Sequence, residues 1–132
     1  MNQYMCKAKR RDNGKWVCGY YVMKEDVIFK TKNHFILIQP EGESFASWYP
    51  VDPDTVCRCT GWADKNGKWI FEGDIFVYSS EYSYVVKWDS KKIGFCAESM
   101  NSTYDYDYLN NFYDILCEVV GNIFDNTELM EE

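Results

Sequence analysis

Six cysteines and one histidine are the residues of this chain best suited to metal binding or nucleophilic chemistry. Cys57 and Cys59 are separated by one residue, so on a strand both thiols would face the same side and could share a metal ion. A zinc site needs four ligands, and neither a second cysteine pair nor a histidine cluster accompanies them. His34, the only histidine, has no partner set for acid–base catalysis. We therefore predict packed thiols without metal or cofactor, and a structural or solvated His34.

Glu72 and Asp74 form a carboxylate pair that is a second candidate for chemistry. One intervening residue would place both on the same face of a strand, as sharing a proton or a cation requires. Turn chemistry explains the same residues, because Gly73 permits a bend and Asp74 can cap backbone amides. We favour the turn. Since no nucleophile stands beside a base and no phosphate-binding loop is present, the sequence predicts no catalytic residue and a protein that is not an enzyme.

Two charged segments are candidate partner-binding surfaces. A basic patch surrounds the first predicted hairpin, where aromatic residues lie nearby and could stack on nucleic acid; it consists of Lys9, Arg10, Arg11 and Lys15. The second segment alternates aromatic and acidic residues, which on a strand puts the tyrosines on one face and the carboxylates on the other; it consists of Tyr104, Asp105, Tyr106, Asp107 and Tyr108. Such a surface suits a basic partner. A solvated turn and a plain acidic loop are the simpler interpretations.

Short strands and tight turns must position these residues. Residues 60–76 are predicted to form a hairpin, because Asn66-Gly67 is the pair that a type I′ turn requires, with positive φ at both central positions. Asn13-Gly14 predicts the same turn in an opening hairpin. Residues 27–31 and 34–38 are expected to pair as strands across residues 32–33, the second of them buried on both faces.

The remaining residues indicate two β units. Residues 39–54 contain all 3 prolines and are predicted to be a surface loop, with a turn of helix near residues 44–48, at the boundary between units 1–54 and 55–132. Strands are then predicted at residues 75–78, 82–88, 94–97 and 117–123, and a short helix at residues 109–116 from its apolar spacing. Five short strands with tight turns indicate an SH3-like barrel or a strongly bent sheet. The predicted fold is mainly β; a single compact body is the alternative to two units.

Residues 60–76 also carry a resemblance. Their pattern is similar to the hallmark of the YopX family, small proteins of bacteriophages and prophages of Gram-positive hosts, in the following residues: Thr60, Gly61, Asp64, Asn66, Gly67, Ile70, Glu72, Gly73 and Asp74. Residues 9–20, 52–56 and 119–126 resemble other parts of the family pattern in the same order. Cys57-Arg58-Cys59 departs from it, because relatives usually have glycine, glutamine and an aromatic residue there. The family has no established activity, so the resemblance implies a phage setting, an SH3-like second unit and a structural role for the hallmark.

The formal net charge of −7 is unevenly distributed. Residues 1–33 contain 8 Lys+Arg and 3 Asp+Glu, whereas the rest of the chain contains 6 and 18. A sequence pI of about 4.7 argues against a broad phosphate-binding surface, because such binding depends on lysine and arginine. Only the amino-terminal third has the charge to contact nucleic acid.

The sequence lacks the usual signals for export or membrane insertion. The opening residues have no charged and apolar regions of a signal peptide, and no apolar run approaches the ~20 residues of a membrane span. We therefore expect the cytoplasm of a bacterial host, no membrane contact and reduced cysteines. The 18% of aromatic residues on small β units predicts exposed apolar surface and a homo-oligomer.

These observations predict a non-enzymatic accessory protein, encoded by a phage or prophage, that acts by binding a protein partner. Modulation of host regulation or defence is the role that the phage setting suggests. The alternative is a nucleic-acid-binding regulator that uses the basic first hairpin.

Overall fold

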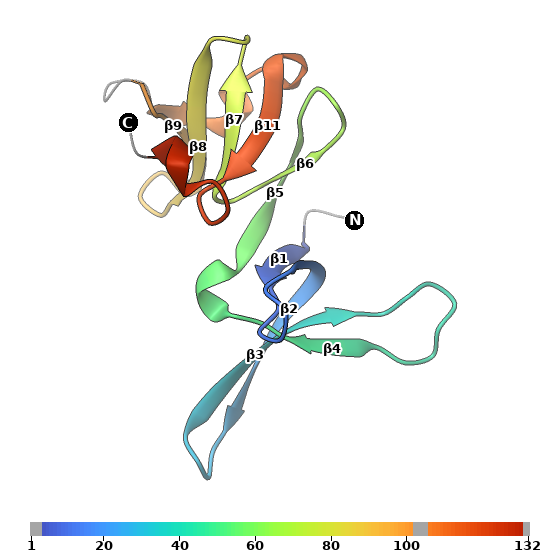
Figure 1. Cartoon of the computed structure of the whole chain (residues 1–132). Helices are drawn as coiled ribbons and strands as arrows, with labels where there is room; N and C mark the ends of the chain where they lie inside the picture. Colours follow the sequence, from blue (N-terminus) through green and yellow to red (C-terminus); the bar gives the residue numbers. More distant parts are fainter. Residues whose placement is uncertain (1–3, 102–105, 131–132) are drawn as a thin grey trace. The chain divides into compact units, whose positions relative to one another are not determined.

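The computed structural model describes residues 4–101 and 106–130 and is mainly β, as predicted (Figure 1). Its strands are antiparallel, and the helices of the described residues are all short 3-10 turns. The chain divides into two compact units, Met1–Cys59 and Thr60–Glu132, so the boundary predicted after residue 54 lies within the first.

Unit 1 is built on a sheet with strand order β4-β3-β2-β1-β5. The strands are β1 (Cys6–Lys9), β2 (Trp16–Asp26), β3 (Thr31–Ile38), β4 (Ser47–Pro50) and β5 (Cys57–Ala63), which continues into unit 2 and pairs there with β6. Strand β2 pairs first with β1 and then, from Tyr20 onward, with β3. Gly19 lies at this change of partner, where a Cβ atom would stand 2.5 Å from the carbonyl oxygen of Leu37. Glycine therefore permits the close approach of β2 and β3.

The connection between β2 and β3 differs from the prediction. Residues 27–31 do not form a strand; Asp26 pairs with Thr31, and Val27–Lys30 is the loop between them. The Asp26 carboxylate accepts hydrogen bonds from the amides of Ile28 (2.9 Å) and Phe29 (3.1 Å). This cap stabilises a turn in which the apolar residues point into solvent, despite their preference for strands.

The stretch predicted as a proline-rich loop is partly ordered as secondary structure. In place of the turn of helix expected at residues 44–48, β4 pairs with β3, from Ile38 opposite Ser47 to Phe35 opposite Pro50. A 3-10 turn, η1 (Pro53–Thr55), follows it. Val51 is buried in the core of unit 1 with Ala8 and Ile36. The second half of the stretch is therefore part of unit 1 and closes its core.

Unit 2 is an open five-stranded sheet with order β10-β9-β8-β7-β11, and in the described residues it does not close into a barrel. The strands of this sheet are β7 (Asp74–Tyr78), β8 (Tyr82–Asp89), β9 (Gly94–Ser99), β10 (Tyr106–Tyr108) and β11 (Cys117–Asn122). Unit 2 also contains β6 (Trp69–Phe71), which pairs with β5. Strands β7 to β10 follow one another, and β11 returns to pair with β7 (Figure 1). Phe76 lies at the centre of the core, 5.4 Å from the ring of Tyr84 and 5.5 Å from that of Phe112.

The helix predicted at residues 109–116 is two separate 3-10 turns, η2 (Leu109–Asn111) and η3 (Asp114–Leu116). The backbone between them is extended, and the Tyr113 amide donates to the Tyr78 hydroxyl (3.2 Å). Leu109 is buried and Phe112 packs on the core, so the apolar spacing is used for packing without a continuous helix. A further 3-10 turn, η4 (Thr127–Met130), follows β11.

The turn after β5 is not the predicted type I′ turn. Gly67 has a left-handed φ of +77°, but Asn66 does not have a positive φ. The Gly67 amide donates to the Asp64 carbonyl (3.0 Å), so the turn is centred on residues 65 and 66 with glycine after it. The Asn13-Gly14 prediction fails in the same way, with Gly14 alone at a positive φ of +70°.

A turn with positive φ at both central residues occurs instead between β7 and β8. Ser79 and Ser80 have φ of 54° and 60°, and the Glu81 amide donates to the Tyr78 carbonyl (3.2 Å). These are the features of a type I′ turn. Serine is not a residue that marks this turn in a sequence, so the pattern gave no signal for it.

Candidate functional site

Asp64, a hallmark residue, is buried and joins three backbone amides. Its Oδ1 accepts from Asn66 and Lys68, both at 2.9 Å, and its Oδ2 accepts from Val119 of β11 at 3.0 Å. The Lys65 amide donates to the Cys117 carbonyl beside it (2.9 Å). Asp64 therefore fixes the turn after β5 and attaches it to the last strand.

The other hallmark side chains also bind the backbone or the core. The Thr60 hydroxyl donates to the Ile70 carbonyl (2.8 Å) and accepts from the Trp62 amide (3.1 Å). Ile70 is buried in the unit 2 core. This arrangement holds β5 and β6 together. The contacts of the Thr60 hydroxyl are therefore structural.

Glu72 and Asp74 do not form an open carboxylate pair. Asp74 is buried, and its Oδ2 accepts from the Phe71 amide (2.8 Å) across a turn in which Gly73 has a φ of +87°. Glu72 is half-buried at the same turn. The contacts of Asp74 are those of turn chemistry, the interpretation that we favoured.

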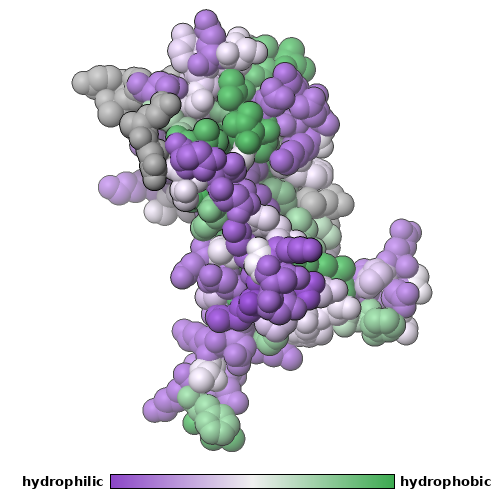
Figure 2. All heavy atoms as spheres, viewed as in Figure 1, coloured by the Kyte–Doolittle hydropathy of each residue, from purple (hydrophilic) through white to green (hydrophobic). Residues whose placement is uncertain are grey.

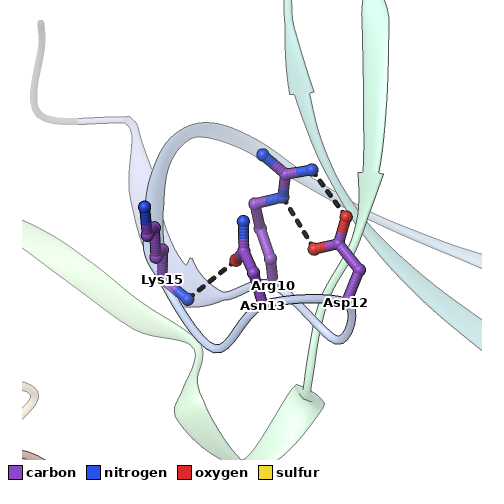
Figure 3. A network of polar contacts seen from close by, with 4 residues as sticks. All are labelled: Arg10, Asp12, Asn13 and Lys15. Carbon is purple, nitrogen blue, oxygen red and sulfur yellow. Dashed lines mark hydrogen bonds and ion pairs between the residues drawn. The ribbon is translucent and has the colours of Figure 1, made fainter.

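Both arginines of the basic patch make polar contacts within unit 1, and Figure 3 shows that of Arg10. The Arg10 guanidinium donates to both carboxylate oxygens of Asp12 (3.0 and 2.7 Å), and this bond holds the pKa of Asp12 below its usual range. Arg11 Nε donates to the Val51 carbonyl (3.2 Å), and Lys9 Nζ lies 5.4 Å from the Trp16 ring centroid. Lys15 contributes its backbone amide, which donates to Asn13 Oδ1 (2.9 Å) in the same turn.

These contacts reduce the capacity of the patch to bind phosphate. The charge of Arg10 is balanced by Asp12, and its guanidinium also lies 4.6 Å from the Tyr49 ring centroid. A phosphate would have to compete with both. Unit 1 as a whole contains 9 Lys+Arg and 7 Asp+Glu, so its net charge is only +2.

The alternating segment lies partly outside the described residues, namely at Tyr104 and Asp105. Tyr106 and Tyr108 of β10 share one face, as the alternation predicts, because both rings lie against Lys92 Nζ (4.8 and 5.2 Å to the centroids). Asp107 instead accepts from the Asn111 side chain (2.9 Å).

Tyr106 is tied to the β8–β9 turn by a short hydrogen bond. Its hydroxyl donates to Asp89 Oδ2 (2.5 Å), and this bond lowers the pKa of Asp89 and raises the pKa of Tyr106. The Tyr108 hydroxyl donates to the Lys92 carbonyl (3.1 Å). The described tyrosines therefore hold β10 and the β8–β9 turn in a fixed arrangement.

A groove of about 240 Å³ lies beside this arrangement; we call it the Trp62 groove. Its lining is mainly apolar and aromatic: Trp62, Ile93, Gly94, Phe95, Tyr108 and Asn110. Trp62 is 49% exposed, although it follows the hallmark residues Thr60 and Gly61. Small-molecule sites typically have about 300–1,000 Å³, so this groove is suited to one or two side chains of a partner.

Sequence reasoning identified Tyr108 but missed the rest of the groove lining. Trp62, Ile93 and Phe95 come from three segments, and only the fold brings them together. It also missed the exposed Val27–Phe29 loop, because the loop contains no glycine or proline. The Asp26 cap was the only available signal.

The cysteines and His34 show no metal site. All six cysteines are thiols, with Cys57 and Cys59 buried, and the Cys57 thiol donates to the Thr55 carbonyl (3.2 Å). His34 Nδ1 lies 2.5 Å from the Tyr21 hydroxyl. In the part of the chain that the structure describes, no three metal-ligating side chains cluster.

No helix of the described residues has the length and apolar character needed to cross a membrane. A family model described as YopX protein matches residues 7–131, nearly the whole chain. This match confirms the resemblance seen in the hallmark. No curated protein matches the chain.

Proposed function

Because the chain belongs to the YopX family, we propose that it is an accessory protein encoded by a phage or prophage that acts by binding another protein. In this proposal it works in the cytoplasm of the bacterial host, is not an enzyme, and modulates host regulation or defence. The phage setting of the family supports the location and the role. The support for protein binding comes from unit 2.

The Trp62 groove is the observation that carries the proposal. It combines an apolar floor with one amide side chain, Asn110, that can hydrogen-bond a partner backbone. Tryptophan and tyrosine are enriched among residues that dominate the free energy of protein association. Trp62 and Tyr108 are both partly exposed at this groove, so a partner side chain would remove apolar surface of both from water.

The charge of unit 2 supports a particular kind of partner segment. Residues 60–132 contain 5 Lys+Arg and 14 Asp+Glu, a net charge of −9. Asp107 is adjacent to Tyr108 in β10, and Asp114 lines a small cavity next to Trp62. We therefore expect an apolar segment with flanking basic residues, because opposite charges favour encounter and orientation.

The open sheet with tight turns and an aromatic groove also supports the SH3-like interpretation of unit 2. Small β domains of this kind bind short peptide segments in aromatic grooves. We include the SH3-like interpretation in the proposal because it indicates that the groove would bind a short peptide segment of the partner.

The experiment compares wild type with Trp62→Ala in pull-downs from host lysate, followed by affinity measurement with the purified partner. Tyr113→Ala is the matched control, because Tyr113 is an exposed aromatic residue of unit 2 outside the groove lining. We expect a partner that binds wild type and the control but loses at least about tenfold in affinity for Trp62→Ala, the loss that 1.4 kcal/mol produces. Equal binding to Trp62→Ala would overturn the proposal.

A further inference from the structure

We propose that the Trp62 groove of one copy binds the β2–β3 hairpin tip, Val27–Phe29, of a second copy, so that the protein self-associates head to tail. The inference rests on the proposed binding role of the groove and names one partner for it.

Among the described residues of unit 1, the hairpin tip is the most exposed apolar segment. Val27, Ile28 and Phe29 are 84%, 85% and 76% exposed, and Figure 2 shows hydrophobic residues at the end of this hairpin beyond a hydrophilic stem. Three consecutive large apolar side chains in water form a patch that usually marks an interaction site. The groove is an apolar surface that can take one or two of these side chains.

The tip is ordered before it binds. The Asp26 carboxylate holds the amides of Ile28 and Phe29, and Lys30 completes the loop in a left-handed conformation with φ of 55°. Strand pairs from Tyr20 opposite Leu37 to Asp26 opposite Thr31 support the stem. Because the loop is already fixed, binding costs little additional conformational entropy.

The charges around the two surfaces tend to opposite signs. Residues 24–32 carry three lysines (Lys24, Lys30 and Lys32) against Glu25 and Asp26, whereas Asp107 and Asp114 lie near the groove. Lys92 is also near the groove, but its ammonium group lies over the rings of Tyr106 and Tyr108. Between whole units the contrast is larger, with +2 on unit 1 and −9 on unit 2. Such contrast favours contact between unlike units of different copies.

The two surfaces are different, so the contact is heterologous. Every open assembly has a free tip at one end and a free groove at the other. Further copies can therefore join, and the assembly grows with concentration unless the geometry closes a ring. An external partner that occupies the groove would compete with the tip. Self-association and partner binding would then be mutually exclusive at each groove.

The first test is sedimentation velocity of wild type, Ile28→Asp and Trp62→Ala over about 1–100 μM, the range in which contacts of about 6–8 kcal/mol are populated. Wild type is expected to grow in mass with concentration, and each variant to remain a 15.6 kDa monomer. The matched controls, Phe45→Asp in another exposed loop of unit 1 and Tyr113→Ala in unit 2, should associate as wild type does. Phe29→Asp repeats the test at the tip if Ile28→Asp alters the circular dichroism spectrum.

The second test mixes the two monomeric variants. Ile28→Asp retains a groove and Trp62→Ala retains a tip, so an equimolar mixture should form 1:1 dimers that do not grow further. A symmetrical contact or a membrane-directed tip predicts no dimer in this mixture. Monomeric wild type, or assembly of Ile28→Asp equal to wild type, would overturn the inference. If the self-association inference fails in this way but Trp62→Ala no longer binds an external partner that wild type binds, the proposed function still holds.

Discussion

Asp64 shows how a hallmark residue can be important without performing chemistry. Its carboxylate accepts from two amides of its own turn and from Val119, 55 residues later in the chain. A buried carboxylate is costly unless its oxygens are hydrogen-bonded, and these three amides satisfy both of them. Asp64 is therefore a structural tie between the first and last strands of unit 2.

The first prediction is that Asp64→Asn lowers the free energy of unfolding by about 1–3 kcal/mol, the usual effect of an unsatisfied buried polar group. The amide would direct an NH₂ group at a backbone amide that Asp64 now satisfies. Urea denaturation followed by tryptophan fluorescence measures the change. Asp107→Asn, at an exposed carboxylate, is the control and should change the stability by less than about 0.5 kcal/mol. Similar effects at both positions would contradict the structural role.

The second prediction concerns the thiols. Denatured protein should show six reactive thiols, whereas native protein at pH 8 should react first at the half-buried Cys6, then at Cys18, whose pKa is raised by burial, and slowly at the four buried thiols. Burial raises the pKa of Cys117 to about 11, so its reactive thiolate is scarce at this pH. Mass spectrometry after timed alkylation identifies the modified residues. Early modification of Cys57 and Cys59 would indicate that β5 opens readily.

Elements with strong local signals were predictable from the sequence. Strands are predicted at residues 75–78, 82–88 and 94–97, and β7, β8 and β9 match them closely because each contains a short run of buried apolar residues. The loops were less predictable. At Val27–Phe29 one carboxylate cap outweighs β propensity, and in residues 109–116 the packing of Phe112 and the Tyr113–Tyr78 bond interrupt a helical pattern.

The third prediction uses the turn at Ser79 and Ser80. Both have positive φ, a conformation that asparagine and glycine tolerate better than serine. Ser79→Asn combined with Ser80→Gly should therefore raise the free energy of unfolding by about 0.5–1 kcal/mol. Ser90→Gly is the control, because Ser90 lies in a turn but does not itself have a positive φ, so the change should lower the stability or leave it unchanged. Destabilisation by the double change would contradict the turn assignment.

The candidate site is formed by segments that are distant in the sequence, so only part of it could be predicted. Composition revealed the unequal charge, and alternation placed Tyr106 and Tyr108 on one face. The groove could not be predicted, because Trp62 and Ile93 lie on segments of different sheets and become neighbours only when unit 2 folds. Such long-range contacts are what a single sequence encodes most weakly, since each contact depends on many others.

The last prediction separates protein binding from the nucleic-acid alternative. At about 0.15 M salt the screening length is about 8 Å, so the acidic side chains of unit 2 still repel a polyanion close to them. In unit 1, Arg10 is paired with Asp12 and Arg11 donates to Val51, so two of the four residues of the basic patch are less available to displace counterions. We therefore expect mobility-shift assays to show only weak binding of DNA or RNA.

Each phosphate contact adds about one unit to the slope of log affinity against log salt, so a regulator using Lys9, Arg10 and Arg11 would show a slope near −3. Replacing the three residues by alanine should flatten that slope, whereas Asp107→Lys should matter more for a protein partner of the Trp62 groove. Lys68→Ala, at a lysine of unit 2, is the control for general loss of positive charge. Tight, salt-sensitive binding by wild type that disappears in the triple variant would make the basic hairpin the functional surface.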